Sequence, residues 1–187
     1  ATIVLEDLAQ CDLLFLVGAN PSSNHPRFMK TIVEMKRRGG HVIVINPLKE
    51  LGLTRFKVPS DVRSMLWGSR IADTYIQPHI GGDIALFAGI ARCLVENNGV
   101  DESYIRHYTS GWEDMLSQVM ATEWKDIEDG SGVSRDRIAE VAATYMASTR
   151  TIFCWAMGIT HHAHGVHNVR AIANLAMMRG MLGRPGR

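Results

Sequence analysis

Small and polar residues follow four apolar segments of the chain, and their types are those that bind polar ligands. They lie in Gly18 to Asn24, in Asn46 and Pro47, in Ile80 to Asp83, and in Gly158 to His164. Such residues collect at the carboxyl edge of an open α/β sheet, beside helix N-termini whose unpaired amides and dipole attract anions. They indicate the binding of a ligand with an extended polar part, and this arrangement favours a nucleotide.

The residues alone leave a structural role open for each of these positions. The first loop contains neither the GxGxxG fingerprint nor the GxxxxGK pattern of a P-loop, and similar residues end strands in any doubly wound fold. Asn20 and Asn46 can adopt unusual turn dihedrals, and His25 can bond a neighbouring backbone group. Asp83 can cap the helix that follows it, as Ser134 can at a later helix. These residues therefore favour a nucleotide as the ligand, but they match no specific nucleotide-binding motif.

Four histidines near the end of the chain, His161, His162, His164 and His167, are the other candidates for chemistry. His161, His164 and His167 step by three residues and could share a helix face as zinc ligands. However, no catalytic carboxylate stands beside them, and HxxHxxH is not a recognised zinc-binding helix pattern as HExxH is. We therefore predict no metal-ligating residue in this chain.

The elements that must position the ligand-binding residues are strands that end at one edge. Continuous apolar runs predict buried strands at Leu13–Val17 and His41–Asn46, and the amphipathic run opened by Pro26 predicts a helix between them. Together these segments form a βαβ unit. Ile71–Pro78 and Thr151–Gly158 predict a third and a fourth strand. The sequence thus predicts a mainly parallel sheet.

Most of the remaining sequence predicts helices. We expect a short lead-in helix near Glu6–Gln10, a helix after Asp83, two modest helices between residues 101 and 124, a helix after Ser134 and a long final helix. Residues 48–68 lack periodicity and predict a long surface excursion with one short helix. The predicted fold is a Rossmann-like, doubly wound, three-layer α/β domain, with a mainly parallel sheet flanked by helices. One domain would comprise a nucleotide-binding part, 1–100, and a helical part with the final strand and helix, 101–187.

Composition and charge exclude several classes of partner. The 187 residues contain 20 Lys and Arg against 19 Asp and Glu, so neither nucleic acid nor a membrane surface is expected as the main partner. The longest apolar runs are far shorter than the ~20 residues that span a bilayer, and the three scattered cysteines indicate no disulfide framework or metal cluster. We expect a cytoplasmic protein. The chain looks cut from a larger one, and exposed apolar surface would then favour self-association.

Several of these motifs together resemble the molybdopterin oxidoreductase family, which includes formate dehydrogenases, nitrate reductases and dimethyl sulfoxide reductase. VGANPSSNHPRFM is similar to the family's first guanosine-binding loop, VINP to the second, and IGGDIAL to the segment where PGTDxAL is usual. WAMGITHHAHGVHNVRAIANLAMMRGMLGRPG resembles GMGxTQHxxGVxNVxAxxNLxLLxGNxGRPG almost position by position. The resemblance extends from about Asp7 to Gly186, and the FxVPxD loop at Phe56–Asp61 resembles formate-dehydrogenase-like alpha subunits most.

The resemblance implies a bis-(molybdopterin guanine dinucleotide) cofactor with molybdenum or tungsten, of which this chain holds one nucleotide arm and touches the pterin. Asp83 matches an Asp that accepts the N1 and N2 hydrogens of guanine. Asn46 stands where the family commonly has Asp, so it would bond the ribose more weakly, and His161 stands where many members have Gln. The cofactor-binding residues that the resemblance implies are Gly18, Asn20, Ser22, Asn24, His25, Asn46, Pro47, Asp83, Met157, Gly158 and His161.

The function implied is that of the central cofactor-binding domain of a molybdenum-dependent, formate-dehydrogenase-like oxidoreductase. Its partners would be the remaining domains of the same chain, and its substrate formate or another small oxyanion. The metal ligand, and the cysteines of any iron–sulfur cluster, would lie upstream of Ala1, so we name no catalytic residue and expect the isolated fragment to be inactive. The alternative is a non-enzymatic regulatory α/β module, which would bind adenine nucleotides as well as guanine nucleotides or better.

Overall fold

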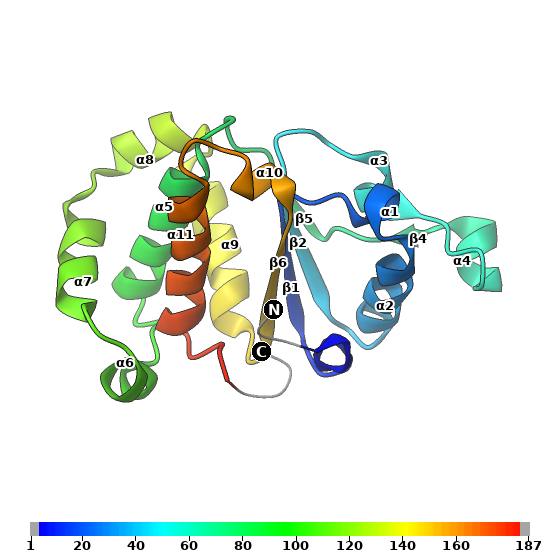
Figure 1. Ribbon diagram of the computed structural model, residues 1–187, viewed down its shortest axis with the longest axis horizontal. Coiled ribbons are helices and arrows are strands. Elements are labelled where there is room, and N and C mark those ends of the chain that lie inside the picture. Colours follow the sequence, from blue (N-terminus) through cyan, green and yellow to red (C-terminus); the bar gives the residue numbers. More distant parts are fainter. Residues whose placement is uncertain (1–3, 184–187) are drawn as a thin grey trace. The chain divides into compact units, whose positions relative to one another are not determined.

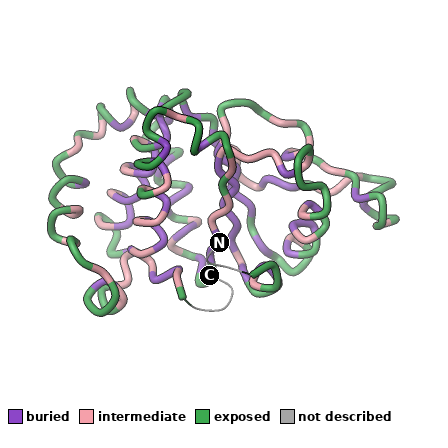
Figure 2. Tube along the Cα trace, viewed as in Figure 1, coloured by how far each residue is buried: buried purple, intermediate pink, exposed green. Residues whose placement is uncertain are grey.

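The computed structural model describes residues 4–183 and contains a main sheet of four parallel strands (Figure 1). Their order across the sheet is β5 (Thr74–Ile76), β2 (His41–Ile45), β1 (Leu13–Val17) and β6 (Thr151–Trp155). Every residue of β1 is buried, and so is every residue of β2 after His41 (Figure 2). The predicted class is confirmed, because the chain is mixed α/β with a parallel sheet and flanking helices.

The strand order reverses next to β1. The chain passes from β1 to β2 and then to β5 in one direction across the sheet, and it returns to β6 on the other side of β1. The carboxyl ends of β1 and β6 therefore form the topological switch point, which is where open α/β sheets bind ligands.

The described residues form two compact units. The first contains residues 4–77 and 149–158, with all strands of the described chain, and the second contains residues 78–148 and 159–183 and is helical. The single domain with parts 1–100 and 101–187 stays a prediction. The last residues of the C-terminal motif, 184–187, lie outside the described residues, as do residues 1–3.

The helices of the first unit follow the predicted pattern around the sheet. They are η1 (Leu5–Ala9), α1 (Pro21–Asn24), α2 (Pro26–Arg37), α3 (Leu51–Thr54), α4 (Val62–Trp67) and the beginning of α10 (Met157–Thr160). Met29 and Ile32 of α2 share a buried core with Leu14 of β1 and Val44 of β2. The apolar side of α2 therefore fixes this helix to the sheet, and burial of these side chains stabilises the unit by about 1.5–3 kcal/mol each.

The excursion at residues 48–68 is more ordered than predicted. It contains two short helices, α3 and α4, and its strand β3 (Arg55–Phe56) pairs antiparallel with β4 (Ser69–Arg70). The carboxylate of Asp61 accepts a hydrogen bond from the backbone N–H of Ser64 (2.8 Å) and caps α4. Gly68, with φ 68°, ends that helix. Figure 1 shows α4 projecting from the first unit.

The third strand is shorter than predicted, and distant hydrogen bonds give the reason. The backbone N–H groups of Ile71 and Ala72 donate to the carbonyls of Thr54 (3.1 Å) and Leu53 (3.0 Å), so these residues leave the ladder with β2. The fourth strand also ends early, at Trp155, because residues 157–160 form α10.

The second unit consists of helices packed around α5. They are α5 (Asp83–Glu96), α6 (Glu102–Tyr108), α7 (Trp112–Ala121), α8 (Trp124–Ser131), α9 (Arg135–Ala147) and α11 (Gly165–Met178). Helix α8 was not among the predicted helices, and it ends at Gly132, which takes the left-handed conformation. The buried hydroxyl of Tyr145 donates to the carbonyl of Leu175 (2.8 Å) and joins α9 to α11. Within residues 4–183, no helix is long and apolar enough to cross a membrane.

Candidate cofactor site

Gly18 connects three strands at the carboxyl edge of the first unit. Its φ of 54° is one that glycine adopts without strain. Its N–H donates to the carbonyl of Ile45 (2.9 Å), and its carbonyl accepts from the N–H of Gly158 (3.2 Å). A Cβ atom on Gly158 would lie 2.5 Å from the carbonyl oxygen of Gly18, so the two backbones can approach this closely only without a side chain. The predicted site residues Gly18 and Gly158 are therefore brought together at the switch point.

The loop after Gly18 is fixed by its own hydrogen bonds. Asn20 precedes α1, and its backbone carbonyl accepts from the N–H groups of Ser23 and Asn24 (3.2 Å each). Its side-chain carbonyl accepts a hydrogen bond from the hydroxyl of Ser22. A Cβ atom on Gly52 of α3 would lie 2.2 Å from that hydroxyl oxygen, so a glycine is needed there. The loop is thus held in place while the amide of Asn20 keeps N–H groups that can donate.

Asn24 and His25 lie on the exposed side of the same loop. His25 joins α1 to α2, and its backbone N–H donates to the carbonyl of Pro21 (2.9 Å). Both side chains are accessible to a ligand, and their contacts with one stay predictions.

Asn46 supports the turn after β2 through its side chain, and its φ is not positive, so the unusual dihedral that the sequence left open is absent. Its side-chain oxygen accepts from the backbone N–H of Leu48 (3.0 Å), and its own N–H donates to the carbonyl of Ile76 (3.0 Å). The carbonyl of the exposed Pro47 accepts from the side-chain amide of Gln77 (2.9 Å). The turn after β2 is therefore self-supporting, and the NH₂ group of Asn46 is the part of its side chain that suits a ribose hydroxyl.

The end of β6 adds apolar surface to the edge. Trp155 and Met157 are 41% and 58% exposed, and they come just before Gly158, whose backbone contacts Gly18. Large apolar residues exposed beside polar loops are typical of ligand sites. Met157 is among the residues predicted from the sequence, whereas Trp155 is not. The signal for Trp155 is an aromatic residue at the last position of a predicted strand.

Asp83 is the predicted site residue of the second unit with the most unusual surroundings. It is 6% exposed and is the first residue of α5, whose N-cap is Gly82, so the prediction that Asp83 caps this helix is wrong. Burial raises the pKa of its carboxyl group, while the charge of His162 and a hydrogen bond from its own backbone N–H oppose that effect. Ser134 does occupy the N-cap position of α9, without a side-chain capping bond.

The histidine-rich segment forms a tight connection into α11. His161 precedes that helix, which begins at Gly165, so the hypothesis that it shares a helix face with His164 and His167 is wrong. The buried amide of Asn168 donates to the carbonyl of Ile159 (3.1 Å) and fixes the connection. Among residues 4–183, no three His, Cys, Asp or Glu side chains are grouped as a metal site would require.

The charge of His162 acts on Asp83, a role that the sequence did not assign to any histidine. His161 is exposed, and its contact with a pterin stays a prediction. Sequence spacing alone does not distinguish the two adjacent histidines, because their order in the loop does not give the direction of either ring.

These groups belong to an α/β chain with polar loops at the switch point of the first unit and a buried carboxylate in the second. The family model of molybdopterin oxidoreductase matches residues 2–187. The chain therefore belongs to the molybdopterin oxidoreductase family, and the predicted membership is confirmed. Membership implies a molybdopterin cofactor with molybdenum or tungsten.

The relatives are much longer than this chain. Protein YdeP of Escherichia coli K12 is 42% identical over 197 residues, which cover 99% of this chain and 26% of that protein. Formate dehydrogenase H of Escherichia coli K12 is 30% identical over 181 residues, with 97% and 23% covered. The chain thus spans about a quarter of the length of these relatives.

A solved structure supports the fold independently. Acetylene hydratase from Pelobacter acetylenicus superimposes with a TM-score of 0.75 over 94% of this chain and 22% of that one, at 19% identity. An identity this low supports the fold alone. The architecture described above is therefore also found in a solved structure.

Proposed function

We propose that this chain is the central cofactor-binding domain of a molybdenum- or tungsten-dependent oxidoreductase, and that it holds the guanine nucleotide arm of a molybdopterin guanine dinucleotide. The observation that carries the proposal is the buried carboxylate of Asp83. A carboxylate has about four acceptor sites, and the described contacts of Asp83 include one donor, its own N–H. The N1 and N2 hydrogens of guanine supply two further donors, whereas adenine has an acceptor at N1.

The cost of burying Asp83 supports a ligand-binding role. Burial disfavours the ionised carboxylate, and hydrogen bonds to a charged acceptor offset that cost by about 1.5–3 kcal/mol each. The position at the start of the long helix α5 also favours an anion there, because the helix dipole is positive at its N-terminus. Asp83 is therefore suited to remain ionised when a ligand supplies donors.

The first unit would hold the other parts of the arm. Gly18, Asn20 and Ser22, with Asn24 and His25, would bind the guanosine or its phosphates, and Asn46 with Pro47 would meet the ribose. Met157, Gly158 and His161 would lie near the pterin. The support is the fixed loop geometry and the side-chain-free approach of Gly158 to Gly18. Glycine at both positions lets a bulky ligand approach the peptide groups directly.

When bound, the cofactor supplies two-electron redox chemistry at its metal, and the protein supplies binding, orientation and exclusion of water. We propose formate or another small oxyanion as the substrate of the whole protein, because a formate dehydrogenase is among the relatives. The metal ligand and any iron–sulfur cluster are expected outside these 187 residues. The isolated domain would then bind and position without turnover, and a cytoplasmic location stays a prediction.

Replacement of Asp83 by Asn in the full-length protein tests the proposal. Asp83→Asn keeps the size of the side chain and exchanges one acceptor for an NH₂ group, which opposes a guanine donor. Loss of one charged hydrogen bond, at about 1.5–3 kcal/mol, predicts roughly 10- to 150-fold weaker retention of the cofactor. The readouts are molybdenum or tungsten content and guanine released by acid hydrolysis, each per mole of protein.

The matched control is Asp136→Asn, which also removes a carboxylate from the first turn of a helix, here at an exposed position of α9. It should leave metal and guanine content unchanged. Full retention of both in Asp83→Asn would contradict the assignment of Asp83. Calorimetric titration of cofactor-free protein with GMP and AMP adds a second criterion, because binding of AMP as tight as that of GMP would favour a regulatory nucleotide-binding module.

A further inference from the structure

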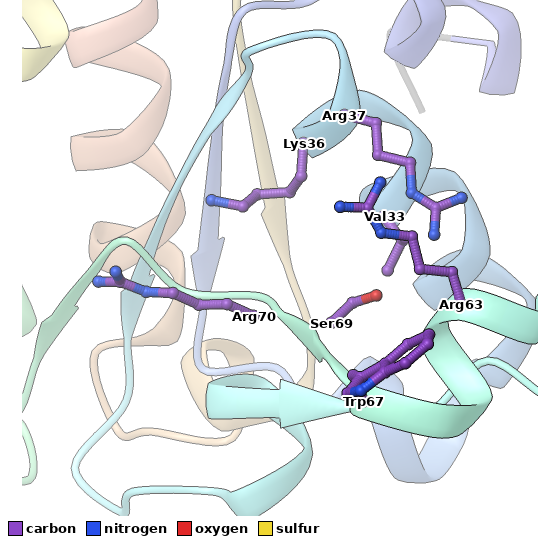
Figure 3. Close-up of a pocket in the computed structure, with 8 residues that line it drawn as sticks. Val33, Lys36, Arg37, Arg63, Trp67, Ser69 and Arg70 are labelled. Atoms are coloured by element: carbon purple, nitrogen blue, oxygen red, sulfur yellow. The ribbon is translucent and has the colours of Figure 1, made fainter.

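A groove of about 700 Å³ opens in the first unit, at the end of α2 away from the candidate cofactor site. Helix α2 begins beside the loop after β1 and ends where the chain returns to the start of β2, so its last turn lies at the amino edge of the sheet. The groove is lined by Val33, Lys36 and Arg37 of α2, Arg63 and Trp67 of α4, and Ser69 and Arg70 of β4 (Figure 3). No carboxylate is among these lining residues.

The charge of the groove is positive even after its ion pairs are counted. Lys36 pairs with Asp73, and Arg37 pairs with Asp61 through two hydrogen bonds. Four cationic side chains less two carboxylates leave a net charge of 4 − 2 = +2. The hydrogen bonds from Arg37 lower the pKa of Asp61 to about 2, so this carboxylate is ionised at neutral pH. Asp61 is therefore counted correctly as one negative charge in the net charge of the groove.

Arg63 and Arg70 carry the charge that these pairs leave over. Within residues 4–183, neither guanidinium forms an ion pair with a carboxylate, and that of Arg70 donates to the backbone carbonyls of Ala72 (3.1 Å) and Asp73 (3.2 Å). Figure 3 shows the guanidinium groups of Arg37 and Arg63 beside Val33, and Lys36 extending toward the side of Arg70. The groove therefore presents cationic groups at both of its ends.

An exposed indole completes the groove. Trp67 is the last residue of α4 and is 68% exposed, which is unusual for the largest apolar side chain. The backbone of Trp67 is held in place, because the guanidinium of Arg55 donates to its carbonyl (2.7 Å) and Gly68 turns the chain directly after it. An aromatic face beside arginines is a platform on which a planar ring can stack.

We propose that this groove binds a nucleotide, with its phosphates at Arg63, beside Arg37, and its base against Trp67. The planar fork of arginine matches phosphate oxygens, and the groove lies within the ~300–1,000 Å³ typical of small-molecule sites. The free faces of Arg63 and Trp67 provide both kinds of contact on one short helix. The site lies at the opposite edge of the sheet from the switch point of the first unit and does not depend on the proposed function.

The test uses the full-length, cofactor-loaded protein, titrated with ATP, pyrophosphate and adenosine at about 0.15 M salt. We expect ATP and pyrophosphate to saturate, ATP to bind more tightly, and adenosine to bind weakly. Arg63→Gln should weaken ATP and pyrophosphate alike by about tenfold. Trp67→Ala should weaken ATP roughly 5- to 150-fold and leave pyrophosphate unchanged.

Controls separate this groove from other basic surface. Arg106→Gln removes an exposed arginine of α6 and should change neither affinity. Circular dichroism of each variant confirms folding. Arg63→Gln is the variant least able to disturb folding, because the nearby carboxylates of Asp61 and Asp73 pair with Arg37 and Lys36. Absence of saturation in the millimolar range overturns the proposal, and so does binding that Arg63→Gln and Trp67→Ala leave intact, or adenosine binding as tight as that of ATP.

Discussion

Replacement of Gly158 by alanine is the sharpest test of the geometry at the switch point. The added Cβ atom would lie 2.5 Å from the carbonyl oxygen of Gly18 and 3.0 Å from its Cα and carbonyl carbon. These are backbone atoms of β1 and its loop, so no flexible side chain can move aside. The end of β6 must shift instead, and the hydrogen bond from Gly158 to Gly18 (3.2 Å) is lost or lengthened.

The expected cost follows from these two effects. Forcing an extra carbon into a packed contact costs about 1–3 kcal/mol, and a lost backbone hydrogen bond costs about 1 kcal/mol more. We therefore expect Gly158→Ala to lower the free energy of unfolding by about 2–4 kcal/mol, measured by denaturant titration. The same shift should reduce molybdenum or tungsten content in the full-length protein, because the predicted pterin loop moves with Gly158.

Gly39→Ala is the matched control. Gly39 has φ 91° and nothing within 4 Å of an added Cβ, so this change introduces backbone strain without a steric contact. Its expected cost is about 1–2 kcal/mol, with no loss of metal content. If Gly158→Ala destabilises the chain no more than Gly39→Ala does, the close approach of β6 to β1 is not the constraint that we infer.

Two further predictions concern the second unit. Asn168→Leu leaves the carbonyl of Ile159 without its donor at a buried position, so it should lower the free energy of unfolding by about 1–3 kcal/mol and increase hydrogen exchange in the connection before α11. Because the pKa of Asp83 is raised in the folded state, the folded chain binds its proton more tightly than the unfolded chain does. The stability of cofactor-free protein should then fall as pH rises above the usual Asp value, and Asp83→Asn should remove this fall. Denaturant titrations at several pH values measure it, and an unchanged slope in the variant would refute the assignment.

The sequence by itself determined the strands and the edge at which they end. LLFLV and HVIVI are continuous apolar runs, which is the pattern of strands buried on both faces in a parallel sheet, and both form strands within one residue of the predicted ends. Pro26 and the glycines after Arg38 bound α2 in the same direct way. These features depend on local composition and periodicity, which the sequence contains in full.

Local sequence patterns predicted the structure less well where the hydrogen-bond partners of a residue lie far away in the sequence. Ile71 and Ala72 are apolar residues typical of a strand. Their backbone N–H groups, however, donate hydrogen bonds to the carbonyls of Thr54 and Leu53. Asn46 suits both a turn and a ribose, and only the structure shows its bond to Leu48. Which partner such a group bonds depends on which distant segments pack against each other. The residue types alone do not show which segments these are.

For the candidate site, too, one part was predicted from the sequence and another part required the tertiary structure. Residue types and motifs identified Gly18, Asp83 and Gly158 as positions of interest. Tertiary structure decided that Gly158 must lack a side chain because Gly18 lies against it, that Asp83 is buried at the first position of α5 rather than capping it, and that His162 acts on its charge. Burial and close contact between backbones depend on packing between distant segments, and only the folded chain brings those segments together.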